Sequence, residues 1–302
     1  MDLKGKKIAV TGATGFLGRY IVDTLIGHGA LVVGVVRNPD RVPELKVKGV
    51  ELRKADLADR DLLAEGFRGT DAVISNAALF DIANQNWEDH LRTNIDGTRN
   101  VFDAIRQSGV KRAVHVSSVA VYRGHKKPVT EDHPQHTEAS RRNRATIYVI
   151  SKALSEQLAW KLAAEYSISL TSVRPSAIYG AFDTNITPWI RRLMAPPVTI
   201  APAMLHFPLV YAGDVAEGIA LVLEKPEITA GKAYNLSGSD VSVWSFMDAW
   251  AEAKGKRPLL RIPIPVPINR HFDITRAATE LGWQNRPFID CLKETFAAEA
   301  GK

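Results

Sequence analysis

The chain carries the residues Thr11-Gly12-Ala13-Thr14-Gly15-Phe16-Leu17-Gly18 between a short apolar run and the start of an amphipathic segment. Gly12 permits a tight turn, Gly15 lets the backbone approach a ligand without a Cβ in the way, and Gly18 lets a helix pack close to the preceding strand. Free N–H groups at the start of such a helix attract phosphates. A plain tight turn is the alternative, but this context predicts a strand, a pyrophosphate-binding turn and a helix. The predicted cofactor contacts in the turn are Gly12, Thr14, Gly15, Phe16, Leu17 and Gly18.

Strand-like and helical patterns alternate through the first half of the chain. Short apolar runs, typical of strands, occupy residues 8–11, 31–36, 50–53, 72–75, 113–117 and 169–174. Helical patterns separate them at residues 16–26, 61–67, 87–107 and 148–166. This alternation predicts an α/β fold in which helices cover both faces of a parallel sheet, the doubly wound Rossmann arrangement. We expect residues 1–175 to form this cofactor-binding domain.

The character of the sequence changes after Pro175. Prolines cluster between residues 188 and 208 and again between residues 258 and 267, and helical patterns occupy residues 213–223, 243–254 and 275–281. These features predict a smaller, less regular C-terminal α/β lobe over residues 176–302 that binds the substrate. Because residues 233–236 could still add a strand to the main sheet, we expect the lobe to be partly interleaved with the first domain.

The composition is that of an ordinary soluble globular protein, with 45% hydrophobic and 24% charged residues. The formal net charge of +6 comes from lysines and arginines spread along the chain, so nucleic acid is not an expected partner. Cys291 is the only cysteine, which excludes an intramolecular disulfide. No apolar stretch reaches the length of a membrane span or a signal-peptide core. We therefore expect a cytoplasmic protein with no membrane partner, and we predict no metal site.

The end of the second predicted strand bears on the choice of cofactor. Arg37 follows Val35-Val36, where an NAD enzyme usually has an acidic residue that binds the ribose hydroxyls. An arginine suits the 2′-phosphate of NADP instead, and Arg41 could assist it. We therefore predict NADP(H) as the cofactor, with Arg37 as its specific contact. Asp40 keeps NAD open as the alternative, and a solvated arginine is the simpler explanation of Arg37.

Further candidates follow the third and fourth predicted strands. Asp56 and Leu57 end the third, and Asn76, Ala77 and Ala78 end the fourth. Ligands of doubly wound sheets bind at the carboxyl ends of the strands, so these residues are predicted cofactor contacts. The Asp56 carboxylate could accept a hydrogen bond from the adenine amino group, and the small alanines could let the cofactor lie against the backbone.

A candidate catalytic pair lies at the start of the helical pattern over residues 148–166. Tyr148 and Lys152 are four residues apart and share one helix face. A nearby ammonium stabilises a phenolate and lowers the pKa of the tyrosine, which makes the phenol a useful acid or base. Ser118, at the end of the fifth predicted strand, could hold a substrate oxygen beside the tyrosine. The pair occurs often by chance, so the prediction depends on its place downstream of the glycine turn.

Motifs over nearly the whole chain form one consistent set. They are TGATGFLG at 11–18, ADL at 55–57, NAA at 76–78, TNIDGTRNV at 93–101, HVSSVAVY at 115–122, YVISK at 148–152, RPSAIYG at 174–180, VYAGDVA at 210–216, YNLSG at 234–238 and FDITRAATELGW at 272–283. The set resembles the extended short-chain dehydrogenase/reductases of the NAD-dependent epimerase/dehydratase superfamily. It is specific for the superfamily and poorly specific for the substrate.

The resemblance implies roles for individual residues. It implies a catalytic triad of Ser118, Tyr148 and Lys152, in which Tyr148 and Lys152 also contact the cofactor. It implies that Pro175 and Ser176 line the nicotinamide pocket. The predicted substrate contacts are Leu79, Ser118, Tyr179 and Phe207.

Two polar positions and two helices complete what the resemblance implies. Asp214 is interpreted as a structural helix cap, a role that suits aspartate, and Asn94 as a core hydrogen-bonding residue. The helices predicted over residues 87–107 and 148–166 resemble those that form four-helix dimer interfaces in the family. A homodimer is therefore one option for the assembly.

The superfamily contains both net oxidoreductases and enzymes that act on nucleotide sugars. Many of its epimerases have a diphosphate-binding arginine seven residues before the aspartate that matches Asp214, and this chain has Phe207 there. The lobe around Phe207 is apolar, with Trp189, Met194, Met204 and Leu209, although these residues could equally form its own core. VVRNPD at 35–40 resembles the strand end of NADPH-dependent reductases such as the dihydroflavonol reductases.

These features favour an NADP(H)-dependent reductase of a ketone or aldehyde on a fairly hydrophobic small molecule. A nucleotide-sugar epimerase or dehydratase with tightly bound NAD(P) and a non-catalytic NADP-sensing protein are the alternatives. Basic clusters at 125–127 and 141–144 could bind an anionic substrate tail, although a solvated loop is the simpler interpretation.

Overall fold

The computed structural model describes residues 2–80, 86–124, 128–143, 146–195, 198–201, 206–238, 240–254, 260–264 and 271–300. The chain forms two compact units and passes between them several times. The first unit comprises Met1–Gly124, Glu131–Arg174 and Ala216–Tyr234, and the second comprises His125–Thr130, Pro175–Val215 and Asn235–Lys302. The division into a cofactor-binding domain and a substrate-binding lobe stays a prediction about what these units do.

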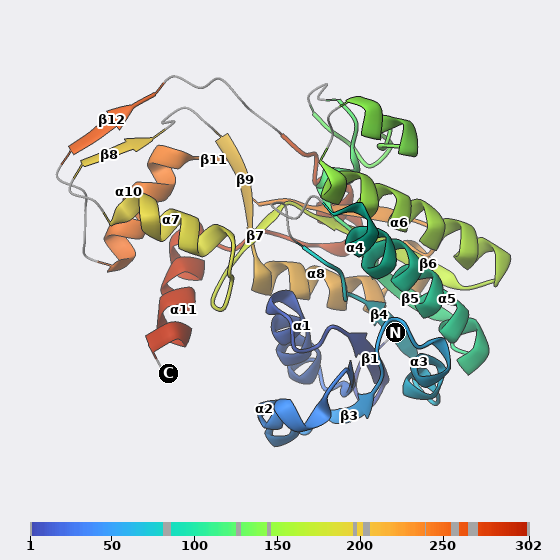
Figure 1. The fold of residues 1–302 in the computed structure, drawn as a ribbon. Coiled ribbons are helices and arrows are strands. Elements are labelled where there is room, and N and C mark those ends of the chain that lie inside the picture. The colour runs from blue at the N-terminus through green and yellow to red at the C-terminus, as the bar shows by residue number, and fades with distance from the viewer. Residues whose placement is uncertain are drawn as a thin grey trace. The chain divides into compact units, whose positions relative to one another are not determined.

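A seven-stranded sheet with the order β10-β6-β5-β4-β1-β2-β3 forms the centre of the first unit (Figure 1). Its strands are β1 (Lys7–Thr11), β2 (Leu31–Val36), β3 (Glu51–Lys54), β4 (Ala72–Ser75), β5 (Arg112–Val116), β6 (Ser169–Pro175) and β10 (Ala233–Leu236). Neighbouring strands from β3 through β6 pair in parallel. The strand order reverses between β1 and β4, which is where doubly wound sheets bind ligands. The predicted fold class, including the added strand at residues 233–236, is confirmed.

Helices cover this sheet because each connection between parallel strands must cross over one of its faces. They are α1 (Phe16–Gly27), α2 (Pro43–Val47), α3 (Arg60–Phe67), α4 (Trp87–His90), α5 (Gly97–Ser108), α6 (Ile147–Glu165), α8 (Ala212–Glu224) and α9 (Pro226–Thr229). Apolar side chains of α3, α5 and α6 form one hydrophobic cluster with residues of β1, β2, β4 and β5. Figure 1 shows α1 and α8 on the other side of the sheet.

The helix predicted over residues 87–107 contains an irregularity that its pattern did not reveal. A π-helical segment, Leu91–Asp96, lies between α4 and α5. Such wider turns are rare and often mark functional positions. This one contains the buried residue Asn94.

The second unit has smaller sheets. One consists of β11 (Asp240–Ser242), β9 (His206–Tyr211) and β7 (Ala177–Tyr179), and a parallel ribbon pairs β12 (Leu260–Pro263) with β8 (Val198–Ala201). Its helices are α7 (Ile186–Met194), α10 (Val243–Lys254), a π-helical segment (Ala277–Leu281) and α11 (Phe288–Ala300). The helices α7 and α11 were not predicted from the sequence. No helix in the described part of the chain is long and apolar enough to cross a membrane.

His28 connects the end of α1 to α8. Its Nδ1 lies 3.0 Å from a Glu224 carboxylate oxygen, and its Nε2 lies 3.1 Å from a Glu217 carboxylate oxygen. Partial burial lowers the pKa of His28, but the hydrogen bonds to the two carboxylates outweigh it, so the pKa lies above its ordinary value. A raised folded-state pKa stabilises the protein below the unfolded-state pKa, and this stabilisation is lost as the pH rises through the folded-state pKa.

We therefore predict that His28→Gln costs more stability at pH 5.5 than at pH 8.5. Because the three side chains are partly exposed to solvent, the difference should be about 1 kcal/mol or less. Urea unfolding at both pH values measures it, with His271→Gln, which removes an exposed histidine elsewhere in the chain, as the control. An equal loss at both pH values would contradict the assigned charge state.

Candidate active site

The glycine turn joins β1 to α1. Gly12 has a φ of +67°, a conformation that other residues rarely adopt. The Gly15 N–H donates to the Gly12 carbonyl at 3.0 Å, and α1 then begins at Phe16 with no side chain capping its start. A helix start of this kind offers its N–H groups to an anion. The turn therefore fits the diphosphate of a dinucleotide.

Close contacts explain why small residues occupy this turn. A Cβ on Gly18 would lie 2.0 Å from the Gly12 carbonyl oxygen, well inside any allowed contact. A Cβ on Gly12 would lie 2.9 Å from the Cα of Ala77, so the end of β4 also touches the turn. Ala77, predicted as a cofactor contact, thus has a packing role against Gly12 as well.

Thr11 fastens the end of β4 to the turn, a role that sequence reasoning missed. Its hydroxyl accepts hydrogen bonds from the N–H groups of Asn76 and Ala77 at 3.0 and 3.1 Å, and it donates to the Ile74 carbonyl at 3.3 Å. The Asn76 amide donates to the Gly12 carbonyl at 3.3 Å. Asn76 therefore stabilises the turn through this hydrogen bond. Ala78, two residues later, is exposed.

The ends of β2 and β3 present the other predicted cofactor contacts. Arg37 follows β2 directly and is exposed. The Asp40 carboxylate lies 3.7 Å from the Lys46 ammonium, so a cation already faces it. Asp56 is exposed after β3, and its carboxylate accepts a hydrogen bond from the Ala58 N–H at 2.9 Å. Leu57 packs against the hydrophobic core.

The structure brings the predicted catalytic residues together within the first unit. Ser118 follows β5, and its hydroxyl lies close enough to the Tyr148 phenol to act against the rise in the pKa of that phenol. Its Oγ also accepts a hydrogen bond from the Ala120 N–H at 3.1 Å. Lys152, on the next turn of α6, is only 4% exposed and donates to the Val116 carbonyl at 2.9 Å. The hydroxyl, the phenol and the ammonium thus gather at the end of β5.

Burial changes the acidity of the pair. It raises the pKa of Tyr148 to about 12, although the hydrogen bond with Ser118 opposes this. It lowers the pKa of Lys152 to about 8, and the negative charge of Glu156 opposes that. The prediction that Lys152 lowers the pKa of Tyr148 is therefore wrong for this arrangement. The reason is that the Lys152 ammonium bonds the Val116 carbonyl and is not among the groups that set the acidity of the phenol.

Asn94 connects the segment after β4 to α6, the helix of the candidate catalytic residues. Its side chain accepts a hydrogen bond from the Leu79 N–H at 2.7 Å and donates to the Leu79 carbonyl at 3.1 Å and to the Ser151 hydroxyl at 3.0 Å. The residue is 1% exposed, as expected for core hydrogen bonding. It places Leu79 and α6 at a fixed distance. The next residue, Phe80, is 42% exposed and packs edge-on against Tyr148, with ring centroids 4.9 Å apart.

The predicted residues Pro175, Ser176 and Tyr179 belong to the second unit. Ser176 is buried, and its N–H donates to the Leu236 carbonyl at 3.1 Å. Pro175, beside it, is buried at the end of β6. Tyr179 is 3% exposed and packs against Phe288 at 5.2 Å between ring centroids, which is the place of a core side chain. Substrate contact at Tyr179 stays a prediction. The described part of the chain does not include Met204, residues 125–127 or residue 144, nor the side chains of Trp189, Phe207 and residues 141–143.

Asp214 has a different role from the one predicted. It lies inside the first turn of α8, and both of its carboxylate oxygens accept hydrogen bonds from Arg286, at 2.7 Å from the side chain and 3.1 Å from the backbone N–H. The predicted helix cap is therefore wrong. The carboxylate binds Arg286, which is 72 positions away in the sequence. This contact attaches the segment before α11 to α8.

We predict that Gly18→Ala lowers stability by about 1–3 kcal/mol, because its Cβ would overlap the Gly12 carbonyl. It should also weaken the binding of a dinucleotide by moving the start of α1. The matched control is Gly27→Ala at the other end of α1, where an added Cβ meets nothing within 4 Å. Thermal unfolding and NADPH fluorescence titration measure both effects. Equal results for the two variants would contradict the packing role of Gly18.

Comparisons with known proteins identify the family and the fold of the chain. A model of the NAD dependent epimerase/dehydratase family matches residues 8–237, from β1 through β10. The chain is 30% identical over 279 residues to a 4-hydroxy-2-methyl-3-oxo-4-farnesyl-3,4-dihydroquinoline-1-oxide ketoreductase of Stigmatella aurantiaca, covering 90% of this chain and 78% of that one. It is 28% identical over 269 residues to a dihydroflavonol 4-reductase of Hordeum vulgare, covering 80% and 73%.

A solved structure shows the same fold. The UDP-glucuronic acid 4-epimerase from Bacillus cereus, in complex with UDP-glucuronic acid and NAD, has a TM-score of 0.81 at 20% sequence identity, covering 98% of this chain and 99% of that one. The resemblance inferred from the motifs is confirmed. The chain belongs to the NAD dependent epimerase/dehydratase family.

Proposed function

We propose that the protein is an NADP(H)-dependent oxidoreductase that reduces the ketone or aldehyde of a fairly hydrophobic small molecule. The observation that carries this proposal is the grouping of three side chains at the end of β5: the Ser118 hydroxyl, the Tyr148 phenol whose acidity it affects, and the Lys152 ammonium one turn farther along α6. The reductases among its relatives support the reaction class.

The proposed chemistry assigns one task to each residue. A reduced nicotinamide, when bound, supplies a hydride to the carbonyl carbon. The Ser118 hydroxyl donates a hydrogen bond to the carbonyl oxygen, and Tyr148 donates its proton to that oxygen as negative charge develops. A phenol with a pKa of about 12 is fully protonated at neutral pH, so the acid is ready for reduction. An ammonium has three N–H donors, so Lys152 can bond the Val116 carbonyl and still hold a ribose hydroxyl.

The preference for NADP(H) rests on the end of β2. The exposed Arg37 guanidinium suits a 2′-phosphate, whereas Asp40, which would favour NAD, lies beside the Lys46 ammonium. NAD remains the alternative cofactor.

An apolar substrate is supported by the aromatic surface beside the phenol. Phe80 remains 42% exposed while its ring packs on Tyr148, and Leu79 precedes it. A nucleotide-sugar epimerase or dehydratase is the second candidate, favoured by the shared fold with such enzymes. It differs in retaining oxidised cofactor and consuming no NADPH, and a non-catalytic NADP-binding protein would show no turnover.

We predict that Tyr148→Phe lowers kcat for NADPH-dependent carbonyl reduction by about 100-fold or more, since a positioned proton donor contributes a factor of this order. The NADPH Kd should stay within about twofold, because the phenol donates to the substrate. Tyr166→Phe, which removes a phenol bonded to Asp103 beyond the same helix, is the control and should keep its turnover. Stopped-flow NADPH oxidation across a carbonyl panel measures all three proteins. Turnover near that of the wild type in Tyr148→Phe would sink the assignment.

We further predict that Arg37→Ala weakens NADPH binding by about tenfold or more and leaves NADH binding unchanged, since a charged hydrogen bond contributes about 1.5–3 kcal/mol. Titration of both cofactors by fluorescence measures the split. Arg60→Ala on α3, which removes an exposed arginine paired with Asp61, controls for the loss of positive charge. An unchanged NADPH affinity in Arg37→Ala would contradict the proposed recognition of the 2′-phosphate.

A further inference from the structure

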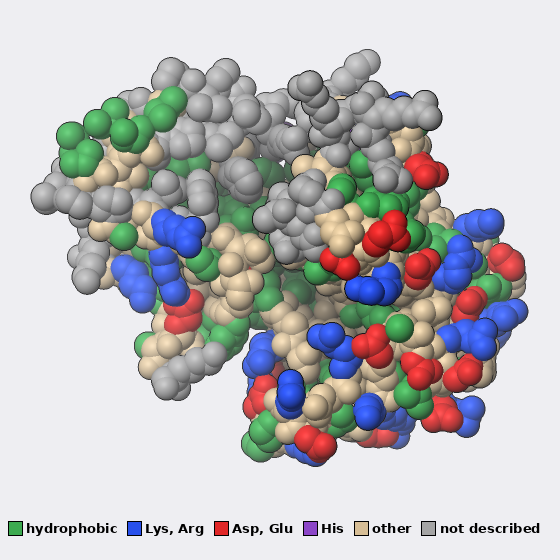
Figure 2. All heavy atoms as spheres, in the orientation of Figure 1, with side chains coloured by type: hydrophobic (Ala, Val, Ile, Leu, Met, Phe, Trp, Pro, Cys, Tyr) green, Lys and Arg blue, Asp and Glu red, His purple; other side chains and the backbone are tan. Residues whose placement is uncertain are grey.

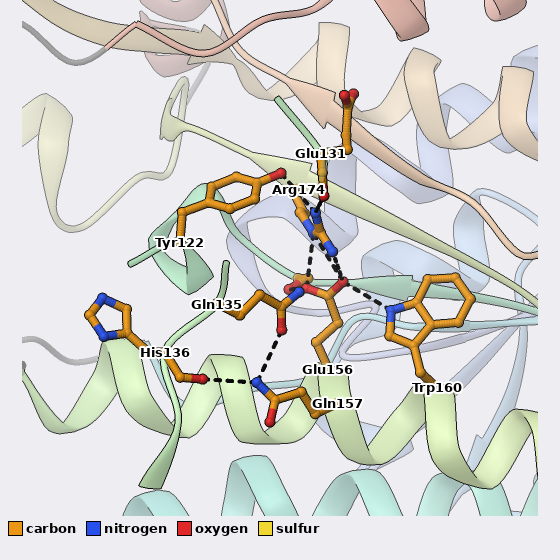
Figure 3. Close-up of polar contacts among 9 residues, drawn as sticks. Tyr122, Glu131, Gln135, His136, Glu156, Gln157, Trp160 and Arg174 are labelled. Atoms are coloured by element: carbon orange, nitrogen blue, oxygen red, sulfur yellow. Dashed lines mark hydrogen bonds and ion pairs between the residues drawn. The ribbon is translucent and has the colours of Figure 1, made fainter. Parts of the chain in front are cut away.

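The Glu156 carboxylate is completely buried where α6 packs against the ends of β5 and β6 (Figure 3). The Ser117 hydroxyl donates to it at 2.5 Å and the Trp160 indole N–H at 3.1 Å. The Arg174 guanidinium donates to both oxygens, with its shortest contact at 2.6 Å. Each of these donors comes from a different place in the chain, so the carboxylate joins β5, β6 and α6.

Arg174 extends this network to the loop that follows Ser118. Its Nη1 donates to the Tyr122 hydroxyl and to the Glu131 carbonyl, each at 2.8 Å, and the guanidinium lies 5.0 Å from the centre of the Tyr122 ring. Burial raises the pKa of Glu156, but the charge and hydrogen bonds of Arg174 outweigh this and hold the pKa below its ordinary value. Glu156 is therefore ionised throughout the neutral range.

Two members of the network, Glu156 and Ser117, are close in the sequence to the candidate catalytic residues. Glu156 lies one turn after Lys152 and two turns after Tyr148 on the same face of α6. Ser117 precedes Ser118 directly, and its N–H donates to the Val173 carbonyl of β6 at 2.8 Å. Lys152 binds the neighbouring Val116 carbonyl. The two residues just before Ser118 are thus held by Lys152 at the Val116 carbonyl, by Glu156 at the Ser117 hydroxyl and by β6 at the Ser117 N–H.

We propose that Glu156 is a positioning residue for the reaction: through Ser117 it fixes the Ser118 hydroxyl beside the Tyr148 phenol on the same helix. This inference rests on the proposed function. Stability alone explains the arrangement poorly, since a buried ion pair often contributes no more than a well-packed apolar pair of the same volume. A carboxylate in this place does what an apolar side chain could not do, because it accepts the hydrogen bond of Ser117 and carries a charge near Lys152.

The test compares two variants that each remove one hydrogen bond to the same carboxylate. Ser117→Ala removes the bond toward Ser118, and Trp160→Phe removes the bond from within α6, while both keep the pair of Glu156 with Arg174. We expect Ser117→Ala to lower kcat about tenfold at an NADPH Kd within twofold of wild type, since positioning a reacting group can account for such a factor. Trp160→Phe should keep kcat within about twofold, and Ser117→Thr should restore it. Equal kcat in Ser117→Ala and Trp160→Phe at similar Tm would overturn the proposal.

A second measurement does not depend on turnover. Amide hydrogen exchange followed by NMR reports on the Ala120 N–H, which is bonded to the Ser118 Oγ. We expect exchange at Ala120 to be about tenfold faster in Ser117→Ala and unchanged in Trp160→Phe. Equal exchange in the two variants overturns the positioning role even if the enzyme turns over. Absence of NADPH oxidation by the wild-type protein would instead overturn the proposed function, so the two failures can be told apart.

The pH profile separates the charge of Glu156 from its hydrogen bond. Glu156→Gln removes the anion that opposes the effect of burial on Lys152, so the alkaline limb of kcat/KM should move to lower pH. Ser117→Ala keeps the anion and should leave that limb in place, and Glu156→Asp should return it toward the wild-type position. An alkaline limb at the same pH in wild type and Glu156→Gln contradicts the proposed action on Lys152. If Glu156→Gln does not fold, the comparison of Ser117→Ala with Trp160→Phe still decides the proposal.

Discussion

Helix α1 can begin directly after β1 because Gly18 has no Cβ. The Gly12 carbonyl oxygen occupies the space that a Cβ on residue 18 would need. This steric constraint brings the start of α1 over the end of β1, where its N–H groups gather at the point at which the strand order reverses. The Thr11 hydroxyl then connects the end of β4 to the same turn. The segment after β4 passes to Leu79, which Asn94 connects to α6. The position of α6, which carries the candidate catalytic residues, relative to the glycine turn therefore depends on contacts that begin at Gly12 and Gly18.

A second constraint is the set of buried charged groups next to the candidate catalytic residues. Lys152, Glu156 and Arg174 are each less than a twentieth exposed, and burial lowers the pKa of the nearby His115 to about 3, which leaves its ring neutral. One anion thus lies between two cations in surroundings from which water is largely excluded, where electrostatic interactions act more strongly than at the surface. Removing the anion would leave the buried Arg174 guanidinium without its ion-pair partner, a larger cost than the loss of a surface ion pair. By contrast, Figure 2 shows lysines and arginines beside acidic residues at the exposed surface, where ion pairs contribute little.

Sequence patterns predicted the features that depend on residues close to one another in the chain. The glycine spacing fixes the turn, the apolar runs fix the buried strands, and the four-residue spacing places Tyr148 and Lys152 on one helix face. The partners that decide acidity come from distant parts of the chain and have no periodic signature. The bond from Lys152 to the Val116 carbonyl, the contact of Glu156 with Ser117 and the clamp of Asp214 by Arg286 all appear only in the folded chain. For the same reason, the π-helical turn around Asn94 and the burial of Tyr179 could not be inferred from hydrophobic periodicity.

The acidities bear on the direction of the proposed reaction. Reduction of a carbonyl consumes a proton at Tyr148, and with a pKa of about 12 the phenol supplies it throughout the neutral range. Oxidation of an alcohol requires the phenolate, which costs free energy in buried surroundings unless a cation lies close to it. Lys152 is a candidate for this cation, since it lies on the same helix face. With a pKa of about 8, however, Lys152 begins to lose its charge at the pH values that would favour the phenolate. On the proposed chemistry, these opposing titrations favour reduction at neutral pH, and the charge of Glu156 widens the pH range in which Lys152 can assist.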